Sequence, residues 1–198
     1  MKGIMAEVPE DLLEDRRRTG ADRWDEMWEG VLHIPPAPNR THQDFEFQLE
    51  LWLRDYWAKP QGNRVYHQIN LASAGSWPDD YRIPDLVLLT PDRFEIDQDA
   101  FFEGPPLVVV EIHSPGDESY EKLDFYAKLG VPETWIIHRD SRKPEIYLLN
   151  GNEYREAEPD ADGWLKSTAS GVWMKPRRPK KLLLQRGAEA ATRGVLPE

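Results

Sequence analysis

The stretch LVVVEIHSPGDESYEKLDFYAKLGVPETWIIH, residues 107–138, decides the fold. It opens with an apolar run at 107–112, which predicts a buried strand of the kind found at a sheet centre. A helix is expected at 120–130, ending at Gly130, and a second apolar strand at 134–138. Because a strand, a helix and another strand in this order form a right-handed crossover, we expect the two strands to be parallel.

A second helix is expected over residues 41–58, well before this unit. Its apolar side chains recur at three- and four-residue steps, as in an amphipathic helix: His42, Phe45, Leu49, Trp52, Leu53 and Tyr56. Thr41 is the expected N-cap of this helix. For the helix of the crossover unit, Ser119 and Asp117 are both candidate caps.

Strand character recurs in the rest of the chain. Three further strands are predicted at 28–35, 65–72 and 82–90, and two strand runs flank Asn150-Gly151, a strong signal for a hairpin. Residues 91–104 are expected to form a polar connection with a helical turn at 99–102. The pattern weakens after Trp164.

These elements predict an α/β protein with a mixed sheet flanked by helices and an added C-terminal β-hairpin. A chain of 198 residues is expected to form one main domain. We expect a charged lead-in at 1–22, a core with its appended hairpin at 23–158, and a C-terminal strand with a basic tail at 159–198.

The composition excludes several classes of protein. The chain has no cysteine, which excludes disulfides and thiolate metal sites and is compatible with a reducing cytoplasm, where we expect the protein to reside. No window approaches the roughly 18 apolar residues of a membrane span, so no membrane partner is expected. The first 20 residues contain no apolar core of a signal peptide.

Charge is unevenly distributed. The net charge is -11, yet residues 164–188 contain no acid and seven basic side chains, which leaves the remainder at -18. Two interpretations stay open for this basic stretch: contact with a polyanion, or a solvated tail that offsets the acidic body, which we favour.

Two carboxylates interrupt apolar strands. Asp85 opens the strand at 82–90 and Glu111 lies near the end of the strand at 107–112. If the strands pair and the two residues share a face, the carboxylates converge, and a hard cation such as Mg²⁺ suits them. Lys122 on the following helix can lie near that edge and stabilise negative charge on a phosphate. Two carboxylates and a lysine in this arrangement are typical of metal-assisted phosphodiester hydrolysis.

Structural roles for the same residues stay open. Asp85 could cap its strand or pair with Arg82, and Glu111 could belong to a buried ion pair, since a buried carboxylate needs a partner. Lys122 could be a surface lysine paired with a nearby acid of its own helix, Glu118 or Glu121.

Four segments together resemble a known family. They are PD at 84–85, EIHSP at 111–115, EKLDFYAKLGVPETWII at 121–137 and DEMWEGVLHIPPAPNRTHQDF at 25–45. They are similar to the PD-(D/E)XK nuclease superfamily and, within it, to the Uma-type (Uma-two) family of restriction-endonuclease-like proteins. The resemblance implies an αβββαβ core of the restriction-endonuclease type, in agreement with the element order above.

The resemblance also implies roles for individual residues. Asp85 and Glu111 would ligate a divalent metal, helped by the backbone carbonyl near Ile112. The superfamily lysine commonly lies two residues after the glutamate, where this chain has His113, so we assign the lysine role to Lys122. His113 is then a bystander, a phosphate contact or the sign of a weakened site.

Further residues are candidates for supporting roles. His42 lies on the inward stripe of the 41–58 helix, so it could donate a hydrogen bond to the metal site, although such histidines are more often structural. Glu26 matches an acidic position of the family pattern. We interpret Glu46 and Glu50 as a solvated helix edge.

We therefore expect a Mg²⁺-dependent endonuclease that hydrolyses DNA, with Mn²⁺ as an alternative metal. The main alternative is a catalytically inactive nuclease-fold domain that serves as a binding or assembly module, favoured by His113 and the acidic net charge. A different hydrolase that uses the carboxylate pair, such as a glycosidase, is a third. Self-association into a homodimer is a further expectation.

Overall fold

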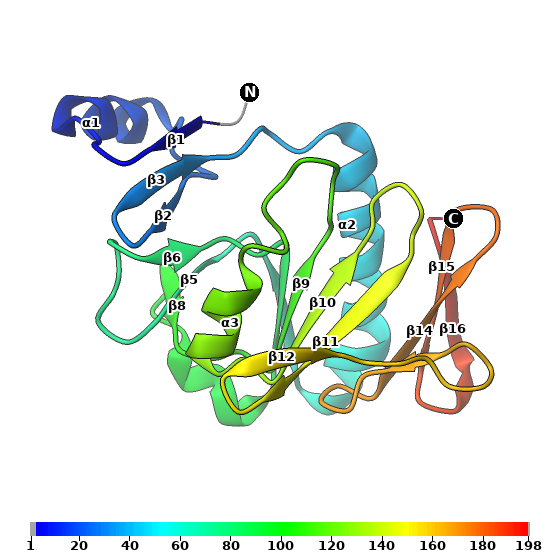
Figure 1. The fold of residues 1–198 in the computed structure, drawn as a ribbon. Helices are drawn as coiled ribbons and strands as arrows, with labels where there is room; N and C mark the ends of the chain where they lie inside the picture. The colour runs from blue at the N-terminus through cyan, green and yellow to red at the C-terminus, as the bar shows by residue number, and fades with distance from the viewer. Residues whose placement is uncertain (1–2, 198) are drawn as a thin grey trace.

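The central sheet carries the segments that decide the fold. The structure is a computed structural model and describes residues 3–197. The sheet has the strand order β12-β11-β10-β9-β7-β4 (Figure 1). Its strands are β4 (Arg64–His67), β7 (Leu86–Leu89), β9 (Val108–Glu111), β10 (Glu133–Ile137), β11 (Pro144–Asn150) and β12 (Glu153–Glu156). Strands β9 and β10 are parallel and the other pairs antiparallel, which confirms the crossover unit, the hairpin and the mixed sheet.

Two helices flank this sheet. Helix α2 (Arg40–Leu53), extended by a π-helical turn at Arg54–Ala58, packs through Phe45 on the face that carries Leu88 and Val110. Helix α3 (Leu123–Leu129) packs through Tyr126 on the opposite face. The order α2, β4, β7, β9, α3, β10 is the predicted αβββαβ core. Within residues 3–197, no helix is long and apolar enough to cross a membrane.

Both helix starts differ in detail from expectation. Asn39, not Thr41, caps α2, because its side chain accepts a hydrogen bond from the N–H of His42 at 3.0 Å. Helix α3 begins at Leu123, later than predicted, without a side-chain cap. Asp117 instead accepts backbone N–H groups of Ser114 and Ser119 and so fixes the loop before the helix.

A second sheet lies beside the first and has the order β1-β3-β2-β6-β5-β8. Its strands are β1 (Gly3–Met5), β2 (Glu26–Trp28), β3 (Val31–Ile34), β5 (Asn70–Ala72), β6 (Tyr81–Arg82) and β8 (Phe101–Glu103). Helix α1 (Glu10–Thr19) follows β1 in the expected lead-in and projects from the body (Figure 1).

Two segments of this region differ from the predicted elements. The single strand expected at 65–72 is split into β4 and β5, because Gln68 adopts φ 49° and turns the chain from one sheet into the other. The connection at 91–104 contains a 3-10 helix at Pro91–Ile96 and strand β8 where a helical turn was expected.

A third sheet replaces the expected strand and basic tail at 159–198. It comprises β13 (Leu165–Lys166), β14 (Val172–Arg177), β15 (Lys181–Arg186) and β16 (Glu189–Leu196), in that order. Trp52 of α2 donates its indole N–H to the carbonyl of Thr192 at 2.9 Å. A Cβ at Gly194 would lie 2.6 Å from the Trp52 ring, so glycine permits this close packing.

Glu133 fastens the third sheet to the central one. This β10 carboxylate is 1% exposed and accepts hydrogen bonds from the Ser167 hydroxyl and from the backbone N–H groups of Thr168 and Ala169. Trp57 of the π-helical turn adds a bond to the carbonyl of Ser170 at 3.0 Å. A buried carboxylate is stable only when its acceptor positions are filled, so the 167–170 turn is held firmly against the core.

Candidate active site

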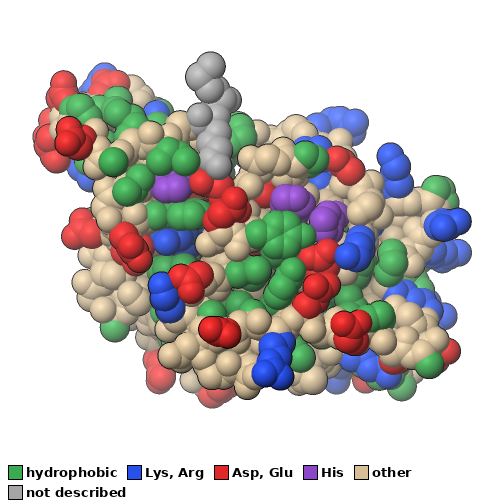
Figure 2. All heavy atoms as spheres, viewed as in Figure 1, with side chains coloured by type: hydrophobic (Ala, Val, Ile, Leu, Met, Phe, Trp, Pro, Cys, Tyr) green, Lys and Arg blue, Asp and Glu red, His purple; other side chains and the backbone are tan. Residues whose placement is uncertain are grey.

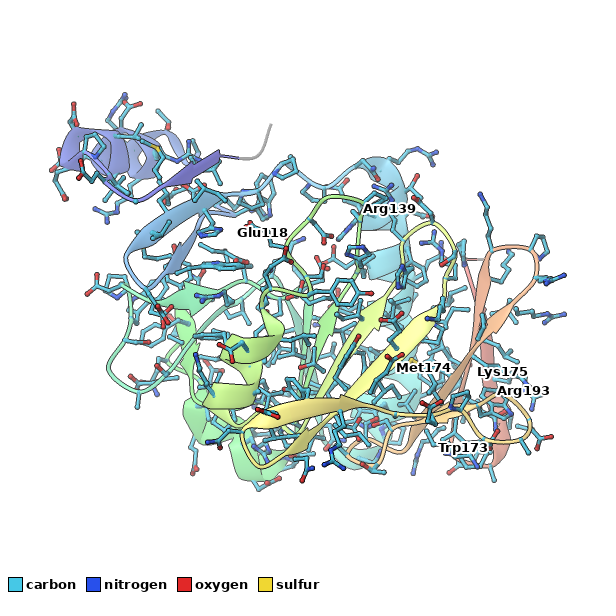
Figure 3. The ribbon with its side chains drawn as sticks, in the orientation of Figure 1. Glu118, Arg139, Trp173, Met174, Lys175 and Arg193 are labelled. Atoms are coloured by element: carbon cyan, nitrogen blue, oxygen red, sulfur yellow. The ribbon has the colours of Figure 1, made fainter. Side chains whose placement is uncertain are left out.

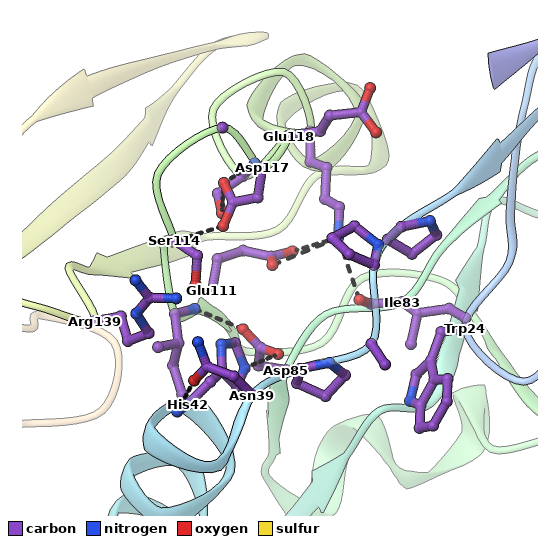
Figure 4. Close-up of a pocket in the computed structure, with 18 of the residues that line it drawn as sticks. Trp24, Asn39, His42, Ile83, Asp85, Glu111, Ser114, Asp117, Glu118 and Arg139 are labelled. Atoms are coloured by element: carbon purple, nitrogen blue, oxygen red, sulfur yellow. Dashed lines mark hydrogen bonds and ion pairs between the residues drawn. The ribbon is translucent and has the colours of Figure 1, made fainter. Parts of the chain in front are cut away.

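A pocket opens where β7 begins and β9 ends. Its volume is about 320 Å³, and its walls come from the second sheet, the start of α2, and the loop between β9 and α3. Figure 4 shows the polar side chains that enter it from these separate elements. Residues predicted from the sequence meet here: Glu26, His42, Asp85, Glu111, Ile112 and Lys122.

Asp85 and Glu111 come from adjacent antiparallel strands. Leu86 pairs with Val110, so continuing this register by one residue brings Asp85 opposite Glu111. Residues opposite each other in an antiparallel pair have Cβ atoms about 4.5–5.5 Å apart. Asp85 Oδ2 accepts the N–H of Ile112 at 2.6 Å, which fixes the aspartate against the end of β9. The sheet therefore holds both carboxylates at one edge.

Lys122 lies between two buried carboxylates. Its Nζ is 2.7 Å from Glu26 Oε1 and 3.3 Å from Glu111 Oε1, and it donates to the carbonyl of Ile83 at 3.2 Å. Glu111 Oε1 also accepts the hydroxyl of Tyr126 at 2.5 Å. Lys122 and Tyr126 are four residues apart, so one face of the helical segment contacts Glu111 twice. The lysine points into the protein and is not a surface lysine.

A second group of polar side chains adjoins Asp85. His42 Nε2 is 2.9 Å from Asp85 Oδ1 and 3.7 Å from Glu46 Oε2. One ligand atom from each of these three residues lies within 4.8 Å of the other two, a spacing that can hold a metal ion. Glu46 is 6% exposed, and Glu50 is buried too, so the interpretation of a solvated helix edge was wrong.

Negative charge dominates the site. Four carboxylates, those of Glu26, Glu46, Asp85 and Glu111, face one lysine and one histidine. Burial, reinforced by the charge of Asp85, raises the pKa of Glu46 to about 8. Burial also raises the pKa of Glu111 to about 8, although Lys122 opposes this. An added cation would relieve this repulsion, so the donor set fits a divalent metal.

The pKa values of Lys122 and His42 are both raised in the site. Burial tends to lower the pKa of Lys122, but the charges of Glu111 and Glu26 outweigh it and raise that pKa above its usual value. Burial also tends to lower the pKa of His42. The hydrogen bond from His42 to Asp85 and the charges of Asp85 and Glu46 outweigh burial, so the pKa of His42 is raised overall. Both pKa shifts favour the charged form of the side chain beside the acidic cluster.

His113 does not join this cluster. Its Nδ1 is 2.8 Å from Asp117 Oδ1, and its ring packs edge-on against Tyr120 and His138. His113 itself does not line the pocket, although its partner Asp117 does. Among the described residues, Lys122 is the ammonium that contacts Glu111.

Gln68 is a site residue that the sequence analysis did not single out. Its Oε1 accepts the indole N–H of Trp24 at 3.1 Å, and its Nε2 donates to Glu46 Oε2 at 3.2 Å. Its backbone N–H donates to the carbonyl of Asp85 at 3.1 Å. The spacing of Glu46 four residues after His42 was a usable signal, whereas nothing in the local pattern marks Gln68.

The chain resembles a solved structure in its fold. The crystal structure of a "putative nuclease belonging to DUF820" from Anabaena variabilis matches with a TM-score of 0.56 and 19% sequence identity. The match covers 69% of this chain and 78% of that one. Among curated proteins, no match was found.

A family profile matches most of the sequence. The Uma2 profile, described as "Putative restriction endonuclease", aligns with residues 11–175. That range includes both strands with acidic ends, the start of α2, and the crossover unit from β9 to β10. The fold likeness and this match agree with the residues that first pointed to a restriction-endonuclease-like core. The chain belongs to the Uma2 family.

Proposed function

We propose that this protein is a Mg²⁺-dependent endonuclease that hydrolyses phosphodiester bonds of DNA. The observation that carries the proposal is the meeting of Asp85, Glu111 and Lys122 at one pocket, from two strands and a helical segment far apart in sequence. The family description and the nuclease-like fold point to the same class of reaction.

Asp85 and Glu111 would hold the metal, with His42 and Glu46 beside Asp85 and with the Ile112 carbonyl as a further oxygen. When bound, Mg²⁺ supplies an activated water and stabilises charge that develops on the phosphate. The carboxylate excess attracts a hard cation with oxygen ligands. Mn²⁺ shares this ligand preference, so we expect it to substitute.

The side chains of this protein prepare the site in three ways. The Ile112 N–H and His42 fix the two oxygens of Asp85. Lys122, held by Glu26 and Glu111, presents an ammonium that can orient a water or stabilise a phosphorane-like charge. Tyr126 donates to Glu111 and so limits rotation of that carboxylate. Glu26 thus supports the lysine and His42 supports the aspartate.

Two broader expectations remain part of the proposal. We propose that the protein acts in the cytoplasm, which the absence of cysteine fits. We also propose a homodimer, because Phe47 and Leu51 leave 64% and 47% of their surfaces exposed on α2, one turn apart. Sedimentation of the purified protein tests the second point.

Cleavage of supercoiled plasmid, linear duplex and single-stranded DNA tests the activity. We expect the wild-type protein to cut at least one form with Mg²⁺ or Mn²⁺ and none with EDTA. The Asp85→Ala variant should not cut. If neither metal supports cleavage, or if Asp85→Ala cuts as well as the wild type, the enzyme proposal fails and the inactive binding module takes its place.

A further inference from the structure

The turn between β14 and β15 is strongly basic. Arg177, Arg178 and Lys180 occupy it, and all three side chains are exposed. Among the described residues none of the three forms an ion pair. Like charges placed side by side repel one another, so this arrangement contributes nothing to folding stability. The clustered positive charges of this turn therefore need an explanation other than folding stability.

Other exposed basic residues of the chain are different. Arg18 pairs with Asp15, Lys59 with Asp55 at 2.5 Å, and Lys128 with Asp124 at 2.6 Å, each with an acid three or four residues away. Those charges are neutralised locally. Since no acid occurs between residues 164 and 188, the turn keeps its full charge although the whole chain is acidic.

The basic turn lies at the same end of the molecule as the pocket. In Figure 1 the β14–β15 turn, the β10–β11 connection and the β9–α3 loop all lie along the upper edge. Figure 2 shows Lys and Arg side chains gathered over the third sheet on that side. The surface over the third sheet on that side is therefore positive, while the pocket itself is acidic.

Arg139 links the pocket to this turn. It lines the pocket (Figures 3 and 4), and its guanidinium is bonded to Asp140 of the β10–β11 connection at 2.8 Å. The hydrogen bond from Arg139 lowers the pKa of Asp140, and the positive charge of Lys180 adds to this effect, so the turn lies within electrostatic reach. Asp140 is exposed, so its pairing with Arg139 is weak and a phosphate can replace it.

We propose that Arg139, Lys180, Arg178 and Arg177 bind the phosphate backbone of a DNA duplex on one side of the scissile bond. This inference rests on the proposed nuclease function and assigns to the third sheet the task of holding substrate. The four side chains form a basic track leading away from the pocket. Phosphate contacts of this kind fix the position of a duplex without reading its sequence.

The test compares two triple variants with equal loss of charge. One is Arg177→Gln/Arg178→Gln/Lys180→Gln in the turn. The matched control is Arg18→Gln/Lys59→Gln/Lys128→Gln, which removes three exposed charges elsewhere. Binding of a fluorescent DNA duplex is measured by anisotropy between about 50 and 200 mM salt, with Ca²⁺ in place of Mg²⁺.

The turn variant should bind the duplex about tenfold more weakly or worse, and its slope of log affinity against log salt should be shallower by about 2 to 3. The control variant should keep the wild-type slope. Equal slopes for all three proteins, an equal loss in the control, or no duplex binding by the wild type would overturn the proposal, as would a preference for single-stranded RNA over the duplex.

The experiments distinguish failure of the proposed DNA-binding surface from failure of the proposed nuclease activity. If the wild type cleaves DNA but the turn variant keeps its salt slope, the track is wrong and the nuclease stands. If the turn variant loses its slope while no protein cleaves DNA with Mg²⁺ or Mn²⁺, the track stands and the chain is a DNA-binding module. Melting curves of both variants establish that the substitutions leave the fold intact.

Discussion

Asp85 Oδ1 lies 2.9 Å from Nε2 of His42, a pair formed between the residue that precedes β7 and the first turn of a helix 43 residues earlier. The other oxygen of Asp85 accepts the Ile112 N–H. Both oxygens are thus oriented before any metal or substrate binds. Preorganised ligands of this kind need no rearrangement as charge develops in the reaction.

The Asp85→Asn variant tests whether activity depends on the negative charge of residue 85 or only on its shape. The amide keeps the size and an oxygen acceptor but removes the negative charge, so cleavage should fall by roughly 10²-fold or more. The pKa of His42, followed by NMR titration, should fall because Asp85 raises it in the wild type. An unchanged His42 pKa together with full activity would contradict the assigned role of Asp85.

Lys122→Met should destabilise the fold. Glu26 and Glu111 would lose their shared cation, and breaking a buried pair costs about 3 kcal/mol or more in the free energy of unfolding. The loss should shrink at pH 5, where the freed carboxyl groups take up protons. Lys128→Met is the control, because the ion pair that it removes is exposed and contributes little to stability. Urea unfolding at pH 8 and pH 5 measures both, and equal losses for the two variants would exclude a buried role for Lys122.

Stability of the metal-free protein should fall as pH rises. Glu46 and Glu111 have folded-state pKa values of about 8, above the ordinary value of 4.5. The folded protein therefore binds extra protons between these values, so this contribution is complete below about pH 4.5, declines up to about pH 8, and then levels off. Mg²⁺ should restore stability most strongly at high pH, because it binds the ionised carboxylates.

Thermal melts at several pH values with EDTA, and again with Mg²⁺, check this dependence. Glu46→Gln removes one of the two groups and should flatten the curve measured in EDTA. A melting temperature that rises steadily from pH 5 to pH 9 in EDTA would contradict the assigned pKa values.

Substitutions of Gln68 by glycine and by alanine should differ in stability but not in activity. Its side chain joins Trp24 to Glu46, while its φ of 49° is strained for a residue with a Cβ. Gln68→Gly relieves that strain, worth about 1 kcal/mol relative to Gln68→Ala. Both variants should weaken metal binding and cleavage to a similar extent. If cleavage tracks stability across the two variants, Gln68 has no positioning role.

The elements with strong periodicity could be predicted from the sequence. The apolar run that ends in Glu111, the following helix and the strand at 133–137 have local patterns that agree with their place in the sheet. The chain order then brings Asp85, Glu111 and Lys122 to one edge. The crossover unit places Lys122 near the end of β9, as the sequence suggested, but its contact with Glu26 depends on the second sheet and was not predicted.

Features that depend on tertiary contacts could not be predicted. The split at Gln68 arises because the chain must pass from one sheet to another, and no glycine marks the turn. The third sheet is basic, and it is held by Glu133 and Trp52, residues distant in sequence. Asn39 and Thr41 are equally suitable caps, so only the chain direction at the Pro-rich entry decides between them.

The account depends most on the claim that Asp85 and Glu111 jointly hold one divalent ion. Crystals of the wild-type protein soaked in Mn²⁺ would test this by anomalous scattering, with Asp85→Asn crystals as the control. We expect a single anomalous peak at ligand distance from both carboxylates in the wild type, and none in the variant. A peak elsewhere, or no peak in a protein that still cleaves DNA, would contradict the account.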